Sequence, residues 1–365
     1  MRRALALARR ALPSAHPNPA VGAVVVHHGE IVGQGFTQPP GQAHAEIVAL
    51  ARAGERARGA TLYVTLEPCC HHGRTPPCVD AIVAAGVSEV RLATIDPSPW
   101  VNGEGVRRLE AAGVRTVVGE GAAEARRLNE AYFKYVSSGL PFVTAKYAMT
   151  ADGKIATSHG RSRWISGAAA REVVARLRAE HDAVLVGVET VLRDDPQLTA
   201  RPGGRLGRRQ PLRVVVDSRL RLPLDARLVS GGLPGATLVL TTELAPPERR
   251  VELERRGVQV AVVPSRGERV DLRAAMMELA RREVVSVLVE AGGTLLAALL
   301  AEGLVDKVVA FVAPKLFGGT DALTPVEGAG IEDPLEALEL VDPVWRRVGR
   351  DIMLEGYVEG CSPAS

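Results

Sequence analysis

One histidine and two cysteines stand at a spacing that suits a catalytic metal ion. His44 begins a segment of helical composition, Cys69 follows Pro68 after an apolar run, and Cys78 comes after eight further residues. One imidazole and two thiolates form a three-ligand zinc site with an open position for water, whereas a structural site is closed by a fourth protein ligand. The sequence therefore predicts that His44, Cys69 and Cys78 bind one Zn2+ ion per chain.

A carboxylate lies two residues beyond the histidine, at Glu46. Zinc lowers the pKa of bound water to about 7, which makes hydroxide available at neutral pH. A nearby carboxylate can then carry the proton of that water to the leaving group. His-x-Glu, followed by Pro-Cys and a second Cys, is the signature of zinc deaminases. Glu46 is accordingly predicted to be the proton shuttle of a hydrolytic deamination.

The loop between the two cysteines is longer than the signature requires. Eight residues rather than two separate them, and three of these are alternative ligands: Cys70, His71 and His72. Two other interpretations stay open, a structural zinc site and a buried histidine beside a redox-sensitive cysteine cluster. A structural site requires a fourth ligand and has no use for Glu46, so the catalytic interpretation is favoured.

The elements around these residues alternate between strand and helix. After a hairpin over residues 20–33, the pattern predicts helix 45–57, strand 61–66, helix 79–85, strand 90–95, helix 104–112, strand 114–118 and one helix over 122–136. Such alternation after a hairpin predicts a layered α/β fold with mixed strand directions. A Ser-Ser-Gly-Leu-Pro break at 137–141 ends this part of the chain. It divides a first domain, 1–140, from a second, 141–365.

The α/β alternation restarts in the second domain. Strands are predicted over 142–147, 183–188, 212–216, 237–240, 258–263, 285–290, 307–312 and 352–358. A helix over 167–180 has Ser166 as its N-cap, and residues 201–209 form an Arg- and Gly-rich loop. Residues 288–295 run from a strand through a Gly-Gly turn into a helix, which suits a phosphate but is also explained by a tight turn. No G-x-G-x-x-G follows the first strand, which argues against a Rossmann fold.

Composition argues against several classes of protein. The net charge is +3 and aromatic residues make up 4%, without the basic stripe of a nucleic-acid-binding surface. No apolar run reaches the ~20 residues of a membrane span, so a cytoplasmic location is expected. Three of the four cysteines cluster within ten residues, which favours metal-binding thiolates in a reducing compartment over disulfides; Cys361 is expected to be incidental. A homo-oligomer is compatible with the sequence, which does not set the oligomeric state.

Longer strings of residues resemble a known family. Residues 68–78, Pro-Cys-Cys-His-His-Gly-Arg-Thr-Pro-Pro-Cys, and residues 16–22, His-Pro-Asn-Pro-Ala-Val-Gly, closely resemble the bifunctional riboflavin-biosynthesis deaminase/reductases of bacteria. Residues 146–156, 162–166 and 187–201 extend the resemblance over nearly the whole chain. The family usually has serine where this chain has Cys70, which gives no reason to count this thiol as a ligand.

The resemblance implies the fold and two activities. An N-terminal cytidine-deaminase-like three-layer domain would use zinc to deaminate a 2,5-diamino-6-ribosylamino-pyrimidinone 5′-phosphate. A dihydrofolate-reductase-like α/β domain would then use NADPH to reduce the ribosyl group to ribityl. Because the cofactor carries the chemistry of hydride transfer, the second domain needs no protein nucleophile.

The resemblance also implies binding residues. In the deaminase, Asn18 would contact the pyrimidine, while His71 and Arg74 would lie at the pocket mouth, with Arg74 suited to the substrate phosphate. NADPH would be held by Ala148, Trp164, Thr190, Asp194, Ser218, Gly292, Gly293 and Thr294. The reductase substrate would be held by Ser162, Arg178, Leu198, Arg201 and Glu290, with the arginines on its phosphate. Independently of the family, Asp194 and Asp195 could cap the helix after Thr190.

Two hypotheses compete with this assignment. The chain could deaminate another pyrimidine, a nucleoside or a tRNA base, with its second half as a binding or oligomerisation module. A tRNA deaminase needs a basic surface with aromatic side chains around the flipped base, and the composition offers little of either. The chain could also be a non-enzymatic zinc-stabilised scaffold, in which replacing Glu46 would change no activity.

Overall fold

The structure, a computed structural model, describes residues 1–207, 209–230 and 232–360. They form two compact units, divided in the sequence between Leu140 and Pro141. The break that was expected to separate two domains lies at this position. Arg208, in the predicted Arg- and Gly-rich loop, and Cys361 lie outside the described residues.

The first unit is built on a five-stranded sheet in the order β2-β1-β3-β4-β5. Strands β1 (Gly22–His27) and β2 (Glu30–Phe36) form the predicted antiparallel hairpin. β1 also pairs antiparallel with β3 (Thr61–Val64), and β4 (Glu89–Leu92) and β5 (Arg115–Val118) continue in parallel from β3. The strand directions are therefore mixed, as predicted.

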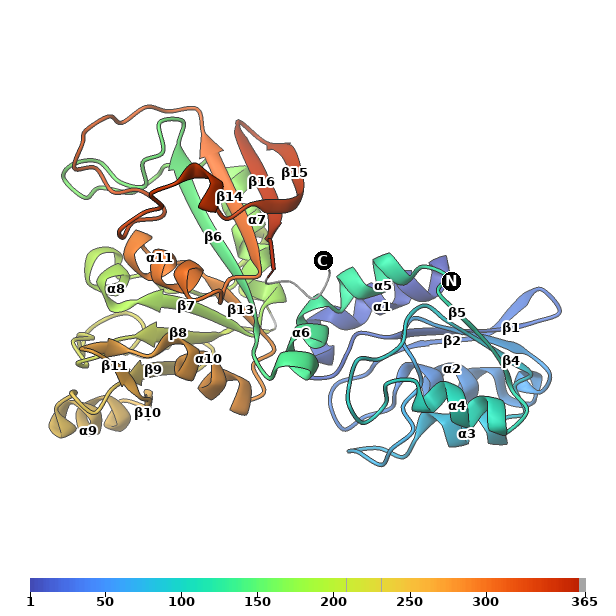
Figure 1. The fold of residues 1–365 in the computed structure, drawn as a ribbon. Coiled ribbons are helices and arrows are strands. Elements are labelled where there is room, and N and C mark those ends of the chain that lie inside the picture. Colours follow the sequence, from blue (N-terminus) through green and yellow to red (C-terminus); the bar gives the residue numbers. More distant parts are fainter. Residues whose placement is uncertain (208, 231, 361–365) are drawn as a thin grey trace. The chain divides into compact units, whose positions relative to one another are not determined.

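Helices cover both faces of this sheet and make three layers (Figure 1). Helices α2, α3 and α4 enclose the larger core with strand residues such as Val25 and Leu62, while α1 packs against Val24 on the other face. α1 was not assigned from the sequence. The bounds are α1 (Arg2–Ala15), α2 (Ala45–Ala53), α3 (Cys78–Ala84), α4 (Glu104–Ala111), α5 (Ala122–Leu128) and α6 (Glu130–Ser138), with a 3-10 turn at Gly54–Ala57.

The single helix predicted over 122–136 is wrong, because Asn129 divides it into α5 and α6. The Asn129 side chain is buried and pairs with the backbone of Ala20: its Oδ1 accepts from the Ala20 N–H at 2.7 Å and its Nδ2 donates to the Ala20 carbonyl at 3.1 Å. A contact 109 residues away thus fixes Asn129 outside helical geometry, at φ −114° and ψ 21°.

The second unit is built on a nine-stranded sheet in the order β10-β9-β8-β7-β13-β6-β14-β16-β15. Neighbouring strands from β10 to β14 are parallel, and β16 and β15 are antiparallel additions. Strand β15 was not predicted. The bounds are β6 (Phe142–Thr150), β7 (Ala183–Gly187), β8 (Leu212–Val216), β9 (Thr237–Thr241), β10 (Gln259–Val262), β13 (Ser286–Val289), β14 (Lys307–Ala313), β15 (Leu340–Val348) and β16 (Asp351–Val358), with a separate hairpin of β11 (Ser265–Arg266) and β12 (Arg269–Val270).

Helices connect these strands and pack on the sheet (Figure 1). α7 packs on Val309 and Phe311 of β14, while α8 and α9 share a core with β7, β8 and β9. The bounds are α7 (Ala168–Glu180), α8 (Val188–Asp194), α9 (Pro247–Arg255), α10 (Leu272–Arg281) and α11 (Gly293–Ala301), with 3-10 turns at Pro202–Gly204 and Pro334–Glu336.

Two predicted helix caps are wrong. Gly167, not Ser166, is the N-cap of α7: its backbone is extended, at φ −73° and ψ 175°, and its N–H donates to the buried carboxylate of Asp351 at 2.7 Å. Asp194 and Asp195 do not start a helix after Thr190; Asp194 ends α8, and Asp195 is its C-cap at φ 39°.

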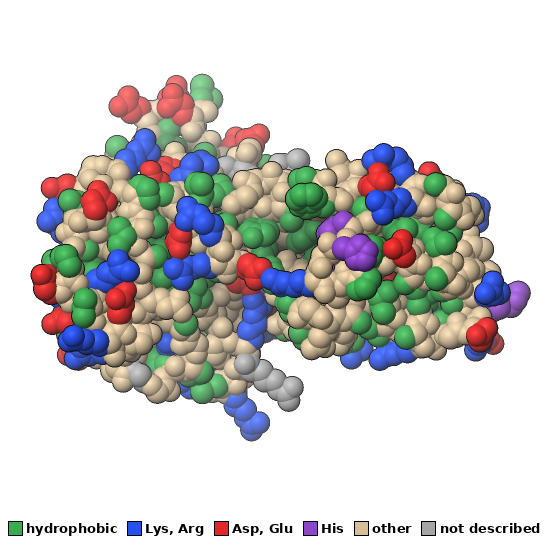
Figure 2. Space-filling model, turned by 90° about the horizontal axis from the view of Figure 1, so that it is seen from below, with side chains coloured by type: hydrophobic (Ala, Val, Ile, Leu, Met, Phe, Trp, Pro, Cys, Tyr) green, Lys and Arg blue, Asp and Glu red, His purple; other side chains and the backbone are tan. Residues whose placement is uncertain are grey.

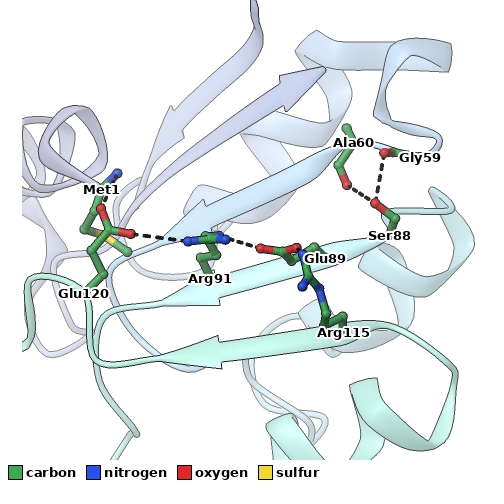
Figure 3. Close-up of polar contacts among 8 residues, drawn as sticks. All are labelled: Met1, Gly59, Ala60, Ser88, Glu89, Arg91, Arg115 and Glu120. Atoms are coloured by element: carbon green, nitrogen blue, oxygen red, sulfur yellow. Dashed lines mark hydrogen bonds and ion pairs between the residues drawn. The ribbon is translucent and has the colours of Figure 1, made fainter. Parts of the chain in front are cut away.

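Charges of both signs are interspersed on the surface. On the face in Figure 2, Lys and Arg side chains alternate with Asp, Glu and apolar side chains on both units. Opposite charges also pair directly within the first unit. The buried carboxylate of Glu89 on β4 forms ion pairs with Arg91 of its own strand and with Arg115 of β5 (Figure 3).

Candidate functional site

Three metal-ligating side chains converge in the first unit. His44 is the N-cap of α2, Cys69 lies in the segment after β3, and Cys78 is the first residue of α3. Their candidate ligand atoms all lie within 4.8 Å of one another. The Nδ1 atom of His44 is 3.5 Å from the Cys69 sulfur and 3.3 Å from the Cys78 sulfur.

This geometry fits a zinc ion. Ligands at Zn–N and Zn–S distances of about 2.0–2.3 Å in a tetrahedral site are separated from each other by about 3.3–3.8 Å. Hydrogen bonds from Cys78 and His44 lower the pKa of the Cys69 thiol, which favours the thiolate that metals bind. The Nε2 atom of His44 faces the Thr75 hydroxyl at 3.2 Å, the kind of outer contact that orients a metal-binding imidazole.

The alternative metal ligands in the loop between the cysteines lie outside the cluster formed by His44, Cys69 and Cys78. Cys70 is buried, and its thiol donates to the Trp100 carbonyl at 3.5 Å. His71, His72 and Arg74 are exposed, and among the described residues the cluster of metal-ligating atoms contains only His44, Cys69 and Cys78. Asn18 lies half-buried in the loop between α1 and β1.

Glu46 lies in the first turn of α2, two residues from His44. It is buried, with 4% of its surface exposed. Burial, and after it the nearby Cys69 thiolate, raise the pKa of Glu46 to about 7. Its carboxyl group is therefore enclosed with the three candidate ligands.

A second buried carboxylate, Glu67, was not predicted from the sequence. It accepts three backbone hydrogen bonds, from the N–H groups of Asp96 at 3.2 Å, Gly103 at 2.9 Å and Val106 at 3.1 Å. Gly105 lets the start of α4 pack closely against the same segment, because a Cβ atom at this position would lie 2.3 Å from the Pro68 carbonyl oxygen. Glu67 thus fixes the segment that carries Cys69 against the start of α4.

Replacing Glu67 by Gln is expected to loosen this segment. The amide group turns an N–H donor toward backbone N–H groups, and a buried donor without a partner costs about 1–3 kcal/mol. We expect the free energy of unfolding in urea to fall by this amount and zinc affinity, measured against a chelator, to fall about tenfold. Glu104→Gln, which removes only surface ion pairs with Arg107 and Arg108, is the matched control. Equal unfolding of the Glu67 variant and wild type would contradict this role.

The second unit contains a cavity of about 1100 Å³ at the ends of β6, β7, β8 and β13. All thirteen residues that the family resemblance assigned to the reductase line it: Ala148, Ser162, Trp164, Arg178, Thr190, Asp194, Leu198, Arg201, Ser218, Glu290, Gly292, Gly293 and Thr294. They come from segments between positions 148 and 294, so the fold brings together residues that are distant in the sequence.

A charged cluster lies in this cavity. Arg178 on α7 grips the carboxylate of Glu290 with two hydrogen bonds, Nε to Oε1 at 2.5 Å and a second nitrogen to Oε2 at 3.0 Å. Lys146 on β6, which was not predicted as a site residue, lies 3.5 Å from the same Oε2. The Arg178 guanidinium, which was expected to engage the substrate phosphate, is paired with Glu290 in this structure, and its role at the phosphate stays a prediction. Among the described residues, the Arg201 side chain donates hydrogen bonds to the neutral side chains of Thr199 and Gln197.

Glu290 makes the stability of the second unit depend on acid pH. Burial alone would raise the pKa of Glu290, but Arg178 and Lys146 lower it to about 2, below its ordinary 4.5. Its ionised form therefore stabilises the fold above pH 4.5, and this contribution, a few kcal/mol, is lost as the pH falls from 4.5 toward 2. We expect the difference in free energy of unfolding between wild type and Glu290→Gln to shrink over this range. A difference that does not vary with pH would contradict the pairing.

A glycine turn forms another wall of the cavity. Gly292 is the N-cap of α11, and Gly293 is its first residue. A Cβ atom at Gly293 would lie 2.5 Å from the Thr324 carbonyl oxygen, whereas one at Gly292 would meet open space. The helix therefore opens into the cavity with backbone N–H groups, which suits an anionic phosphate.

Comparisons with known proteins cover both units. The family model of the RibD C-terminal domain matches residues 141–354, and that of the cytidine and deoxycytidylate deaminase zinc-binding region matches residues 1–94. The riboflavin biosynthesis protein RibD of Actinobacillus pleuropneumoniae is 43% identical over 98% of this chain and 94% of its own length. The chain belongs to the RibD family.

Solved structures of RibD proteins agree over both units. Acinetobacter baumannii RibD matches with a TM-score of 0.86 and 38% identity, over 98% of this chain and 97% of its own. A Thermotoga maritima protein described as a diaminohydroxyphosphoribosylaminopyrimidine deaminase/5-amino-6-(5-phosphoribosylamino)uracil reductase matches with a TM-score of 0.83 and 35% identity, over 98% and 97% of the chains. The predicted fold class, a cytidine-deaminase-like domain followed by a RibD reductase domain, is therefore confirmed.

Proposed function

We propose that the two units catalyse consecutive steps of riboflavin biosynthesis, with the residues named below. The first unit is a zinc-dependent deaminase of a diaminopyrimidinone ribosyl phosphate, and the second reduces the product with NADPH. The observation that carries this assignment is that one RibD-family chain contains both a His-Cys-Cys centre beside a buried carboxylate and a separate cavity with a Lys-Glu-Arg cluster.

In the deaminase, His44, Cys69 and Cys78 would hold zinc, which when bound activates water as a nucleophile. Glu46 takes a proton from the attacking water at its carboxylate and passes it to the departing amine nitrogen. Its burial excludes bulk water from this transfer. Asn18 would orient the pyrimidine, and Arg74, on the exposed loop before Cys78, would meet the substrate phosphate.

In the reductase, a hydride adds to C1′ of the ribosyl group while the bond from C1′ to the ring oxygen breaks. NADPH supplies the hydride when bound, and the ring oxygen takes up one proton. Lys146 is a cationic N–H donor within this cavity, and its pairing with Glu290 holds the ammonium group in place. We therefore assign Lys146 as the proton donor and Glu290 as the residue that positions it. Arg201, whose present contacts are neutral, would bind the substrate phosphate.

The surface charges and the free cysteines indicate which partners and which compartment this chain has. Interspersed surface charges (Figure 2) support a small-molecule rather than a nucleic-acid substrate, and within the described residues no helix could span a bilayer. The three clustered cysteines are free thiols, which supports a reducing, cytoplasmic compartment.

We also propose a homo-oligomer, because β15 ends the sheet and exposes Val344 and Trp345. Light scattering of the full chain, compared with Trp345→Glu, tests this proposal.

Product analysis tests the two reactions. Zinc-loaded protein without NADPH should exchange one amino group of the pyrimidine for oxygen, and addition of NADPH should then add two hydrogen atoms to the sugar. Mass spectrometry of the product distinguishes these changes. Deamination without any later reduction would support the alternative in which the second unit is a binding module.

A further inference from the structure

The cofactor cavity has a basic rim at the end of β8. Arg221, from the loop after β8, and Arg266 and Arg269, from the β11–β12 hairpin, all line it. The hairpin is attached to the end of β8, because the N–H of Val270 donates to the Ser218 hydroxyl at 3.1 Å. Two segments that are distant in the sequence therefore contribute three arginines to the lining of one cavity.

The position of this rim follows from the strand order. Lys146 lies on β6, Glu290 directly follows β13, and Ser218 follows β8, which is separated from β13 by β7. With strands about 4.8 Å apart, β8 lies about 10 Å from β13. A dinucleotide with its reactive ring at Lys146 and its pyrophosphate at the Gly292-Gly293 turn would extend its adenosine toward Ser218.

The three arginines differ in their present partners. Arg221 donates to the Glu189 carboxylate at 2.7 Å, and Arg266 lies 3.5 Å from Glu302. Arg269 is exposed and has no ion pair with any residue that the structure describes. Arg221 also lies 3.9 Å from the buried Asp217 carboxylate, so that, among the described residues, Arg269 is the one of the three arginines without a carboxylate partner.

NADPH differs from NADH by one phosphate on the adenosine ribose. In Rossmann-fold enzymes, which bind the same cofactors on a different fold, a carboxylate near this ribose accepts from the hydroxyl groups of NADH, whereas an arginine accommodates the phosphate of NADPH. Here Arg221 pairs with the carboxylate of Glu189 on α8, so that this carboxylate is not free to receive a ribose hydroxyl. The arrangement matches the second pattern.

We propose that Arg221 and Arg269 bind the ribose phosphate of NADPH, and that Arg221 additionally prevents Glu189 from favouring NADH. Both guanidinium groups can donate two hydrogen bonds to a phosphate. Removing Arg221 therefore has two effects: it deletes a phosphate contact and exposes a carboxylate that repels the phosphate. This inference rests on the proposed reductase function.

Binding measurements on the full chain test the proposal without turnover. Calorimetry of adenosine 2′,5′-bisphosphate and AMP compares ligands that differ only by the phosphate in question, and NADPH and NADH are compared in the same way. Arg221→Gln and Arg269→Gln should each weaken the bisphosphate and NADPH by roughly ten- to a hundredfold, the range for hydrogen bonds to charged groups. AMP binding should be unchanged, which also reports that each variant is folded. NADH binding should be unchanged in Arg269→Gln and unchanged or tighter in Arg221→Gln.

Arg219→Gln is the matched control, because Arg219 lies two residues from Arg221 and pairs with the exposed Glu268. It should bind all four ligands like wild type. Wild-type preference for NADPH that persists in both Arg221→Gln and Arg269→Gln would overturn the proposal while leaving the reductase function intact. Absence of any dinucleotide binding to wild type would instead overturn the reductase function and this inference with it.

Discussion

Glu46→Gln protein is expected to keep its zinc and to lose deamination by about 10²–10⁴-fold, the usual contribution of a general acid–base group. The amide has nearly the same shape as the carboxylate but cannot accept the proton of the attacking water. Because Glu46 is buried beside the candidate ligands, solvent buffer is poorly placed to replace it. Metal analysis and ammonia release measure the two parts of this expectation separately.

Cys70→Ser is the control for this experiment. Cys70 lies next to Cys69 in the sequence, but its thiol contacts the Trp100 carbonyl, and serine can donate the same hydrogen bond. Zinc content and deamination should both match wild type. Full deamination by Glu46→Gln would remove Glu46 from the mechanism and revive the structural-zinc interpretation.

Lys146→Met should bind NADPH normally and reduce the deaminated substrate about 10²–10⁴-fold more slowly. Methionine keeps much of the aliphatic volume of lysine but has no proton to give to the ring oxygen. If Lys146 only balanced the charge of Glu290, the variant would lose stability without a selective fall in kcat. The kcat for reduction of the pre-formed deaminated substrate, together with NADPH affinity by calorimetry, separates these roles.

Lys307→Met is matched to this variant in burial and in the loss of an ion pair. The Lys146 and Lys307 side chains are 17% and 14% exposed, and Lys307 pairs with Glu355 at 2.7 Å on a neighbouring part of the sheet. Lys307 is not among the residues that line the cavity. A similar fall in kcat for both variants would show that the effect at Lys146 is structural.

The candidate zinc centre could be predicted because its chemistry is local in the sequence. His44 and Glu46 are two residues apart, and Cys69 and Cys78 bracket a single loop. Glu67, in contrast, was missed because its partners are backbone N–H groups at positions 96, 103 and 106. No side-chain pattern marks such partners in advance.

The elements that were wrong depend on distant contacts. Asn129 breaks a continuous helical pattern because it pairs with Ala20, and Gly167 caps α7 because Asp351 reaches it from β16. Lys146 was likewise missed as a site residue of the reductase, because its partner Glu290 is far away in the sequence. The cavity residues were named from resemblance to a family rather than from periodicity, and only the fold places them together.

The most direct test of the two-step account is to follow ammonia and NADPH together after wild-type protein meets the diaminopyrimidinone ribosyl phosphate. The account predicts that ammonia appears first, that NADPH oxidation follows after a lag, and that one NADPH is finally consumed for each ammonia. Glu46→Gln should slow both signals by about 10²–10⁴-fold, and addition of pre-formed deaminated substrate should restore NADPH oxidation alone. Oxidation of NADPH without prior release of ammonia, or undiminished oxidation in Glu46→Gln with the diamino substrate, would contradict the account.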